Sequence, residues 1–342
     1  MTRTPEESYD AVLVVGFGGP EKKEDVIPFL ENVLRGKNVP HARLLHVAEH
    51  YYHFDGVSPI NQHARDLIAA LKPELERRDV NLPIFWGNRN WHPMLPDTLR
   101  EMQAGGIQRS LALVLSAYSS YSSCRQYLEN IQQARLQVGG QAPVVDKVRG
   151  FFNHPGFIAA NTARIREALE KMTGEQRQGY FLAFTAHSIP LSMAEHCAYQ
   201  AQLEETARLI ATELGLTDGR WGMAYQSRSG RPTDPWLDPD ICDYLRQVSG
   251  KGIRDVVVHP VGFLSDHMEV IYDLDQEAQE VAAQIGLCMV RSSAVGTHPT
   301  FVAMLGELVE ERLRQVHERP ALGCYTALPD TCPPDCCPNP RG

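Results

Sequence analysis

The chain has 342 residues, of which 43% are hydrophobic and 22% charged, as in ordinary globular proteins. Its formal net charge of −9 argues against a general nucleic-acid-binding protein. No apolar run reaches the ~20 residues of a membrane-spanning helix, and the polar first ten residues lack a signal-peptide core, so we expect a cytoplasmic protein with no integral membrane segment.

Eight short apolar runs predict buried strands that alternate with segments of helical periodicity. They lie at 11–17, 83–87, 110–117, 143–148, 180–185, 221–226, 255–263 and 288–291. Near-continuous apolar runs are typical of parallel sheets that helices cover on both faces. The alternation predicts an α/β protein with doubly wound, four-stranded parallel sheets. Four strands on each side of residue 150 predict two domains, 1–149 and 150–320, followed by a cysteine-rich tail at 321–342.

Two segments combine a preceding strand with reactive side chains: T-A-H-S-I-P at 185–190 and V-G-F-L-S-D-H-M-E-V-I-Y-D-L-D at 261–275. Open α/β sheets bind ligands at the carboxyl ends of their strands. The first segment supplies His187, and the second supplies Glu269, with Asp273 and Glu277 following at four-residue steps. On a helix these carboxylates share one face, which is unfavourable unless water or a cation relieves their repulsion. A divalent metal site is therefore one interpretation; a solvated helix face and a buried structural histidine are the alternatives.

The first half contains features that suit an anionic, planar ligand. The run S-A-Y-S-S-Y-S-S-C-R-Q-Y at 116–127 offers hydroxyl groups and flat rings after a predicted strand. Arg35, His50 and Arg89 are basic or titratable residues near predicted strand ends or loops. A polar helix-capping loop and scattered surface charge are the simpler interpretations. The turn F-G-G-P at 17–20 lacks the spacing of a dinucleotide fingerprint.

The eight cysteines are unevenly distributed. Four are spread through the body and four lie in the last nineteen residues: Cys124, Cys197, Cys242 and Cys288, then Cys324, Cys332, Cys336 and Cys337. Scattered cysteines of a cytosolic protein are usually inert thiols. The tail is rich in proline and has no core to enter, so its cysteines indicate a metal or iron–sulfur site.

Taken together, these segments closely resemble the ferrochelatase family, which inserts ferrous iron into porphyrins. The matching motifs, in the family's order over roughly residues 10–315, are F-G-G-P, F-L-E-N-V-L-R-G, G-V-S-P-I, T-A-H-S-I-P, Y-Q-S-R-S-G with D-P-W-L-D-P-D, and V-G-F-L-S-D-H-M-E-V-I-Y-D-L-D. The resemblance implies two Rossmann-like domains with the porphyrin in the cleft between them.

The resemblance also implies roles for individual residues. It assigns His187 and Glu269 to catalysis and to the inner iron site, and Asp273 and Glu277 to an acidic relay for metal or protons. Whether His187 binds iron or accepts protons stays open.

Porphyrin contacts follow from the same resemblance. Ser58 and Tyr127 match positions that contact the porphyrin carboxylates, Arg35 lies where basic residues approach the propionates, and His50 belongs to the same polar region. Two positions depart from the family pattern. Phe17 stands where gram-positive members have a tyrosine, which excludes axial ligation by that residue, and Asn90 replaces a family histidine.

The segment 35–54 is short and polar where protoporphyrin-using members carry an apolar lip, so we expect coproporphyrin III, with four propionates, as substrate beside Fe²⁺. Protoporphyrin IX is the alternative substrate. Rival functions are a non-catalytic tetrapyrrole carrier, a cobalt or nickel chelatase and an iron–sulfur redox protein. A downstream haem-synthesis enzyme is a candidate protein partner.

The tail resembles the iron–sulfur extensions of some ferrochelatases. The resemblance implies a [2Fe–2S] cluster held by Cys124, Cys324, Cys332 and either Cys336 or Cys337, as in the actinobacterial type. Structural zinc and a redox-labile tail without metal are the alternatives.

Overall fold

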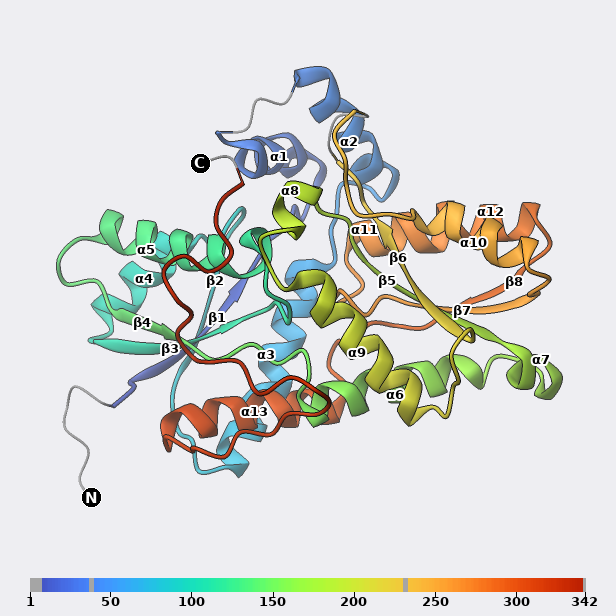
Figure 1. The fold of residues 1–342 in the computed structure, drawn as a ribbon. Helices are drawn as coiled ribbons and strands as arrows, with labels where there is room; N and C mark the ends of the chain where they lie inside the picture. Colours follow the sequence, from blue (N-terminus) through green and yellow to red (C-terminus); the bar gives the residue numbers. More distant parts are fainter. Residues whose placement is uncertain (1–7, 37–39, 230–232, 341–342) are drawn as a thin grey trace. The chain divides into compact units, whose positions relative to one another are not determined.

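The computed structural model describes residues 8–36, 40–229 and 233–340. The chain forms two compact units, each with its own sheet (Figure 1). The first unit comprises Met1–Leu115, Gln126–Arg149 and Leu305–Glu318, and the second comprises Ser116–Arg125, Gly150–Met304 and Arg319–Gly342. The chain therefore passes between the units more than once. The predicted domain boundary at residue 150 and the separate tail stay predictions.

The first unit contains a four-stranded parallel sheet in the order β2-β1-β3-β4. Its strands are β1 (Ala11–Gly16), β2 (Ile84–Asn88), β3 (Arg109–Val114) and β4 (Val144–Lys147). Its helices are η2 (Lys23–Asp25), α1 (Val26–Leu34), α2 (His41–His53), α3 (Ile60–Arg77), α4 (Leu95–Ala104) and α5 (Gln126–Val138). The last part of α13 (Pro299–Leu313) also belongs to it.

The second unit repeats the arrangement with the parallel order β6-β5-β7-β8. Its strands are β5 (Phe181–His187), β6 (Trp221–Gln226), β7 (Asp255–His259) and β8 (Cys288–Arg291). Its helices are η3 (Tyr121–Arg125), α6 (Pro155–Leu169), α7 (Gly174–Gly179), α8 (Leu191–Ala194), α9 (Tyr199–Glu213), α10 (Ile241–Gly250), α11 (Met268–Val270), η4 (Ile271–Ala278) and α12 (Gln279–Gln284). None of the described helices is long and apolar enough to cross a bilayer.

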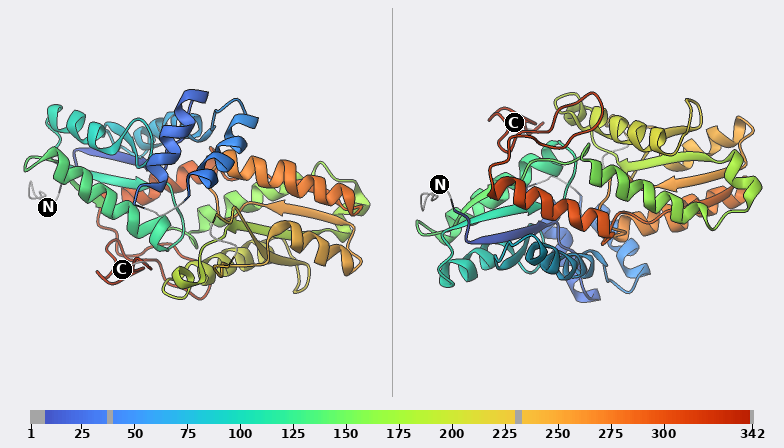
Figure 2. Two further views of the ribbon diagram at one scale, coloured as in Figure 1. Left: turned by 90° about the horizontal axis from the view of Figure 1, so that it is seen from above. Right: turned by 90° about the horizontal axis from the view of Figure 1, so that it is seen from below.

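Apolar side chains of the strands pack against helices in both units. In the first unit Leu13 of β1 joins Leu99 of α4 and Ile131 of α5 in one buried cluster. In the second, α10 and α12 cover one face of the sheet, side by side, and α6 lies on the other (Figures 1 and 2). Coverage on both faces explains why the strands read as continuous apolar runs, and it confirms the predicted α/β class.

All eight predicted strands are present. β6 and β8 have the predicted bounds. The strand predicted at 255–263 ends at His259, because Pro260 has no N–H for a ladder hydrogen bond. The strand predicted at 180–185 continues to His187, so the histidine closes β5 instead of following it.

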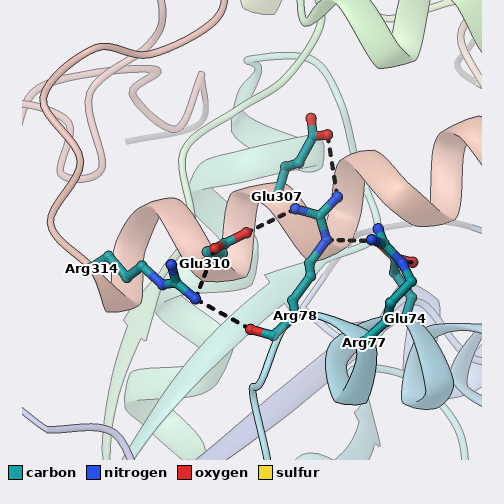
Figure 3. A network of polar contacts seen from close by, with 6 residues as sticks. All are labelled: Glu74, Arg77, Arg78, Glu307, Glu310 and Arg314. Carbon is teal, nitrogen blue, oxygen red and sulfur yellow. Dashed lines mark hydrogen bonds and ion pairs between the residues drawn. The ribbon is translucent and has the colours of Figure 1, made fainter.

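Charged side chains tie the end of α3 to the part of α13 in the first unit (Figure 3). Arg78 has a side chain that is 13% exposed and contacts three carboxylates. Its guanidinium nitrogens lie 2.6 Å from Glu74, 3.2 Å from Glu307 and 2.8 Å from Glu310. Arg314, the residue after α13, contacts Glu310 at 3.0 Å. A partly buried arginine with several acceptors fixes geometry better than an isolated surface pair does.

A second pair attaches α13 to the loop after β4. The guanidinium of Arg149 is fully buried and donates two hydrogen bonds to Glu311, at 2.8 and 3.0 Å. Two planar groups in this bidentate arrangement satisfy each other's charge. Removing one partner leaves a buried charge without compensation, which is far more costly than losing a surface ion pair.

We therefore predict different effects for two neighbouring glutamates of α13. Glu311→Ala should lower the free energy of unfolding by about 3–5 kcal/mol, because Arg149 stays buried without its partner. Glu310→Ala should cost about 1 kcal/mol, because Arg78 keeps two other carboxylates. Urea unfolding of both variants measures the difference, and equal losses would contradict this account of the buried pair.

Candidate functional site

His187 lies at the carboxyl end of a central strand of the second sheet. It closes β5 and is in register with Gln226, the last residue of β6. Its Nδ1 lies 2.5 Å from the carbonyl oxygen of Ser188. Because a carbonyl oxygen only accepts, Nδ1 carries a proton, so in the neutral imidazole Nε2 presents a lone pair. The hydroxyl of Tyr199 donates to the His187 carbonyl at 3.0 Å, which further fixes the backbone here.

The lone pair of His187 faces a carboxylate. Nε2 lies 3.9 Å from Oε2 of Glu269, and the two side chains are 34% and 47% exposed. When the imidazole is neutral, both atoms carry electron pairs and attract each other only through something placed between them. A proton or a metal ion can fill that position. The structure thus brings together the two residues predicted as the inner iron site.

Glu269 begins a segment that is not a regular α-helix throughout. α11 leads into the π-helix η4, which contains Asp273 and Glu277, before α12 continues the chain. Leu274 and Ala278 of η4 are buried against the second sheet. The prediction of one helix carrying the three acidic residues is therefore wrong in helix type, since i→i+5 hydrogen bonds replace i→i+4 bonds over Ile271–Ala278. Single π-helical turns are frequent at functional sites.

We call Glu269, Asp273 and Glu277 the acidic row. Asp273 is its mostly buried member. Its Oδ2 accepts a short hydrogen bond from the hydroxyl of Ser227 and one of 3.2 Å from Nε2 of Gln226. Burial raises the pKa of Asp273 to about 7, supported by the nearby charges of Glu269 and Glu277 and opposed by the two hydrogen bonds. This carboxyl group therefore exchanges protons near neutral pH.

Two residues beside Asp273 were not predicted as site residues. Gln226 is buried, and its Oε1 has no hydrogen-bond partner among the described residues. Ser227 has a positive φ of 60°, which non-glycine residues rarely adopt. Strained backbone and unsatisfied buried atoms are concentrated at functional sites. Gln226 is the last residue of the strand predicted at 221–226 and Ser227 follows it, so their place at a strand end was the available signal.

The acidic row continues past Asp273. Burial and the charges of Asp240 and Glu280 raise the pKa of Glu277. Asp240 caps the N-terminus of α10 by accepting from the Cys242 amide at 2.8 Å, and burial raises its pKa as well. Asp240 lies in the D-P-W-L-D-P-D motif but was not predicted to join the row. The structure thus adds a fourth carboxylate to the predicted three.

The four predicted porphyrin contacts lie in the first unit and differ in exposure. Ser58 and Tyr127 are each only 5% exposed, whereas Arg35 is exposed and His50, on α2, is partly exposed. Arg35 follows α1 and donates a short hydrogen bond to Asn32. These residues offer two accessible side chains and two buried ones.

Arg89 stacks on two of the aromatic rings near these residues. Its guanidinium carbon lies 4.6 Å from the ring centre of Tyr127 and 5.6 Å from that of Phe17. Burial raises the pKa of Tyr127, and the positive charge of Arg89 opposes the increase. Asn90, the next residue, is buried, and its backbone N–H donates to the Phe17 carbonyl at 3.1 Å. A cation held over aromatic faces in this way supplies positive charge at a fixed place.

The predicted cluster cysteines divide into two groups. Sγ of Cys336 and Sγ of Cys337 are 3.5 Å apart, and Cys332 is close enough to affect the ionisation of both. Burial raises the pKa of Cys336, and it raises that of Cys337 to about 12. Cys324 is engaged elsewhere, since its thiol donates to Oε1 of Glu205 at 3.4 Å.

Two residues outside the tail, Arg125 and Cys197, lie close enough to Cys336 to interact with it electrostatically. The positive charge of Arg125, next to Cys124 in η3, opposes the increase that burial causes in the pKa of Cys336. Burial raises the pKa of Cys197, and the nearby Cys336 adds to that increase. Cys197 had been interpreted as a scattered body thiol, and nothing in the sequence separated it from Cys242 or Cys288.

Ready-made metal sites are absent from the part of the chain that the structure describes. No three or more histidine, cysteine, aspartate or glutamate side chains in residues 8–36, 40–229 and 233–340 are grouped so as to hold an ion. His187 and Glu269 supply two donors, and any ion between them must take its other ligands from water or substrate.

The raised pKa of Asp273 predicts a specific dependence of stability on pH. The folded state holds the proton more tightly than the unfolded state, so the stabilisation is complete below the unfolded pKa of about 4 and is lost as pH rises through about 7. Relative to Asp273→Asn, the wild type should lose about 3–4 kcal/mol of unfolding free energy between pH 4 and pH 8. Ser227→Ala should enlarge the loss, because it removes a donor to the ionised form. If the free energy of unfolding changed with pH in the same way in wild type and in Asp273→Asn, the raised pKa of Asp273 would be contradicted.

Comparisons with known proteins identify the family of this chain. The ferrochelatase family model matches residues 9–313. A ferrochelatase of Rhodopirellula baltica is 53% identical over 330 residues, which cover 96% of this chain and 93% of that protein. A coproporphyrin III ferrochelatase of Streptomyces griseus is 47% identical over 350 residues, covering 96% and 93%, and one of Nocardia farcinica is 46% identical over 343 residues, covering 96% of each.

Among solved structures, SirB from Bacillus subtilis with Fe³⁺ aligns with a TM-score of 0.55 at 13% identity, covering 89% of this chain and 95% of that one. The sirohydrochlorin chelatase SirB in complex with cobalt gives a TM-score of 0.54 at 12% identity, covering 90% and 96%. At these identities the structures show a shared Rossmann-like fold and nothing more. The family match and the relatives extend over nearly the whole sequence, and on that basis this chain belongs to the ferrochelatase family.

Proposed function

We propose that this protein is a lyase that inserts ferrous iron into coproporphyrin III in haem biosynthesis. The observation that carries the proposal is the lone pair of His187 facing Glu269 in a member of the ferrochelatase family. Protoporphyrin IX is the alternative substrate, since one close relative is named simply a ferrochelatase. The relatives named coproporphyrin III ferrochelatases favour the first substrate.

His187 and Glu269 are proposed to hold the incoming iron. Metal bonds to imidazole nitrogen and carboxylate oxygen are about 2.0–2.2 Å long, so two donors of one ion are separated by roughly 3–4 Å. The 3.9 Å between Nε2 and Oε2 falls within that range. The hydrogen bond from Nδ1 to the Ser188 carbonyl would orient the ring toward the ion, as backbone carbonyls do for metal-binding histidines elsewhere.

The acidic row is proposed to serve metal and proton transfer. Insertion replaces two pyrrole protons with one Fe²⁺, so the site must accept two protons per turnover. One lone pair cannot hold iron and take a proton at the same time, so Nε2 of His187 becomes the first proton acceptor once the iron has moved from it to the pyrrole nitrogens. Asp273, with a pKa of about 7, is able to take a proton from the site and release it at neutral pH. Glu277 and Asp240 would pass protons or hydrated iron further along the row.

The first unit is proposed to bind the macrocycle through its propionates. Arg35 and His50 have accessible side chains for charge-assisted hydrogen bonds, and Ser58 and Tyr127 supply hydroxyl groups. Arg89, stacked on Tyr127, adds a fixed positive charge near that hydroxyl. Coproporphyrin III carries four propionates, whereas protoporphyrin IX carries two. A first unit with these polar side chains should therefore bind coproporphyrin III more tightly.

An iron-insertion assay with both porphyrins tests the substrate. We predict a kcat/KM for coproporphyrin III at least tenfold above that for protoporphyrin IX, because even one additional charge-assisted hydrogen bond contributes about 1.5–3 kcal/mol. The decrease of free porphyrin fluorescence on addition of Fe²⁺ measures the rate. A higher kcat/KM for protoporphyrin IX would overturn the choice of substrate, and iron-independent binding without turnover would identify a carrier.

His187→Ala in the same assay tests the site. We expect loss of insertion by at least a hundredfold, with coproporphyrin binding changed less than threefold, because the imidazole acts on iron and protons. His196→Ala, a substitution in the nearby segment after α8, is the matched control and should retain activity. Near-normal turnover of His187→Ala would remove His187 from the mechanism.

A [2Fe–2S] cluster held by the tail and Cys124 is a further part of the proposal. Four thiolates are the usual ligands of such a cluster. Cys332, Cys336 and Cys337 lie close together. Arg125 is close enough to Cys336 to affect its ionisation, so the η3 segment that contains Cys124 lies near them. These contacts support three of the four ligand positions. Cys324 would have to exchange Glu205 for the cluster. The thiols of Cys336 and Cys337 have raised pKa values, so ligation through either of them would release a proton.

Anaerobic purification followed by iron, sulfide and zinc analysis tests the cluster. We predict visible cluster absorption with about two irons and two sulfides per chain, lost in Cys332→Ser and kept in Cys288→Ser, whose thiol lies on β8. Comparing Cys324→Ser with Cys197→Ser decides which thiol completes the set. Zinc without sulfide would favour a structural zinc site, and absence of both would contradict a metal-bound tail.

We also propose a cytoplasmic location and a downstream haem-synthesis enzyme as the recipient of the product. The metalated porphyrin is reactive and poorly soluble, which favours direct transfer. Fractionation and cross-linking in the native cells test both statements; recovery in the membrane pellet and absence of a cross-linked partner would contradict them.

A further inference from the structure

Helix α2 concentrates histidine in an unusual way. Its thirteen residues contain four of the thirteen histidines of the chain: His41, His46, His50 and His53. The sequence H-V-A-E-H at 46–50 places two histidines four residues apart with a glutamate before the second. The same order of residues on a helix holds zinc in one class of metalloproteases. The spacing alone matches a metal site, and the geometry determines whether it is one.

The histidines lie on the exposed side of the helix. Leu44, Ala48 and Tyr51 are buried, so they attach α2 to the first unit. A helix turns by about 100° per residue, which places His46 and His50 on the face opposite these three. The side chains of His46 and Glu49 are 54% and 76% exposed. An ion therefore reaches this face from solvent without opening the fold.

The two imidazoles are already neighbours. The ring centres of His46 and His50 are 5.3 Å apart, with an angle of 72° between the ring planes. Imidazole nitrogens bind first-row metals at about 2.0–2.1 Å, so two donors of one ion lie roughly 3 Å apart. Small side-chain rotations bring one nitrogen of each ring to that separation. Such rotations are inexpensive for exposed side chains on a helix.

Glu49 completes the arrangement as an orienting group. Its Oε2 lies 3.6 Å from Nδ1 of His46. A carboxylate facing one ring nitrogen favours the tautomer that carries its proton there, which leaves Nε2 as the metal-binding atom. This carboxylate–histidine pairing is how many metal sites fix a ligand and increase its basicity.

We propose that His46 and His50 of α2 form a binding site for a divalent first-row transition metal, with Glu49 orienting His46. With two protein ligands, water fills the remaining positions. Two imidazoles bind Ni²⁺, Cu²⁺ and Zn²⁺ more tightly than Fe²⁺. The site shares no residue with the pair His187 and Glu269, although His50 is also one of the proposed porphyrin contacts. Its existence does not depend on the proposed iron-insertion activity.

Histidine-resolved NMR with Ni²⁺ as the probe tests the proposal on the full chain. Protein labelled at its histidine rings would be titrated with substoichiometric Ni²⁺, and paramagnetic broadening would report each ring separately from the thiols and from His187. We expect the His46 and His50 signals to broaden together. In His46→Ala, broadening of His50 should require at least tenfold more Ni²⁺, and in Glu49→Gln about tenfold more.

His41→Ala is the matched control, since it removes an exposed histidine from another face of the same helix and should leave the titration unchanged. Alanine favours the helix at exposed positions, and far-ultraviolet circular dichroism would verify that each variant is folded. Unaltered broadening of His50 in His46→Ala would overturn the two-histidine site. Unchanged affinity in Glu49→Gln would overturn the orienting role of the carboxylate.

Discussion

The account of this protein depends on one electrostatic constraint: a row of carboxylates in η4 and its neighbours lies beside an imidazole lone pair. Like charges on successive turns repel, and burial makes ionisation of Asp273 more costly still. The structure reduces this cost by hydrogen bonds from Ser227 and Gln226 and by protonation near neutral pH. A passing cation reduces it further. The repulsion between neighbouring carboxylates, which destabilises the row, also makes the row suitable for binding a divalent metal.

The fold positions this row through ordinary features of parallel sheets. Strands β5 and β6 end side by side, which places His187 next to Gln226. The apolar side of η4 packs against the second sheet through Leu274, which fixes the acidic residues on its other side. His187 and Gln226, at the ends of these strands, are thus held by the buried core of the unit. The first unit uses the same architecture to present basic and hydroxyl groups.

Periodicity and motif order predicted much of this arrangement because they depend on local physics. Continuous apolar runs identified all eight strands, since a strand covered on both faces needs them. His187 and Glu269 were recognisable because polar residues after such strands must lie at the sheet edge. The π-helical form of η4 was not predictable, because four-residue spacing fits an α-helix equally well and the change depends on packing.

Other features depended on contacts that no local pattern encodes. The tautomer of His187 is set by a carbonyl whose direction depends on the turn after β5. The burial of Tyr127 under Arg89 joins residues from α5 and from the loop after β2. Cys324 contacts Glu205 although it is distant from it in sequence. Long-range partners of polar side chains were the part that the sequence alone left open.

The most direct test of the central claim is anomalous diffraction from crystals soaked in Co²⁺ as a stand-in for Fe²⁺. The account predicts a peak about 2.0–2.2 Å from both Nε2 of His187 and a carboxylate oxygen of Glu269. Peaks confined to other parts of the molecule, with none in bonding distance of His187, would contradict it.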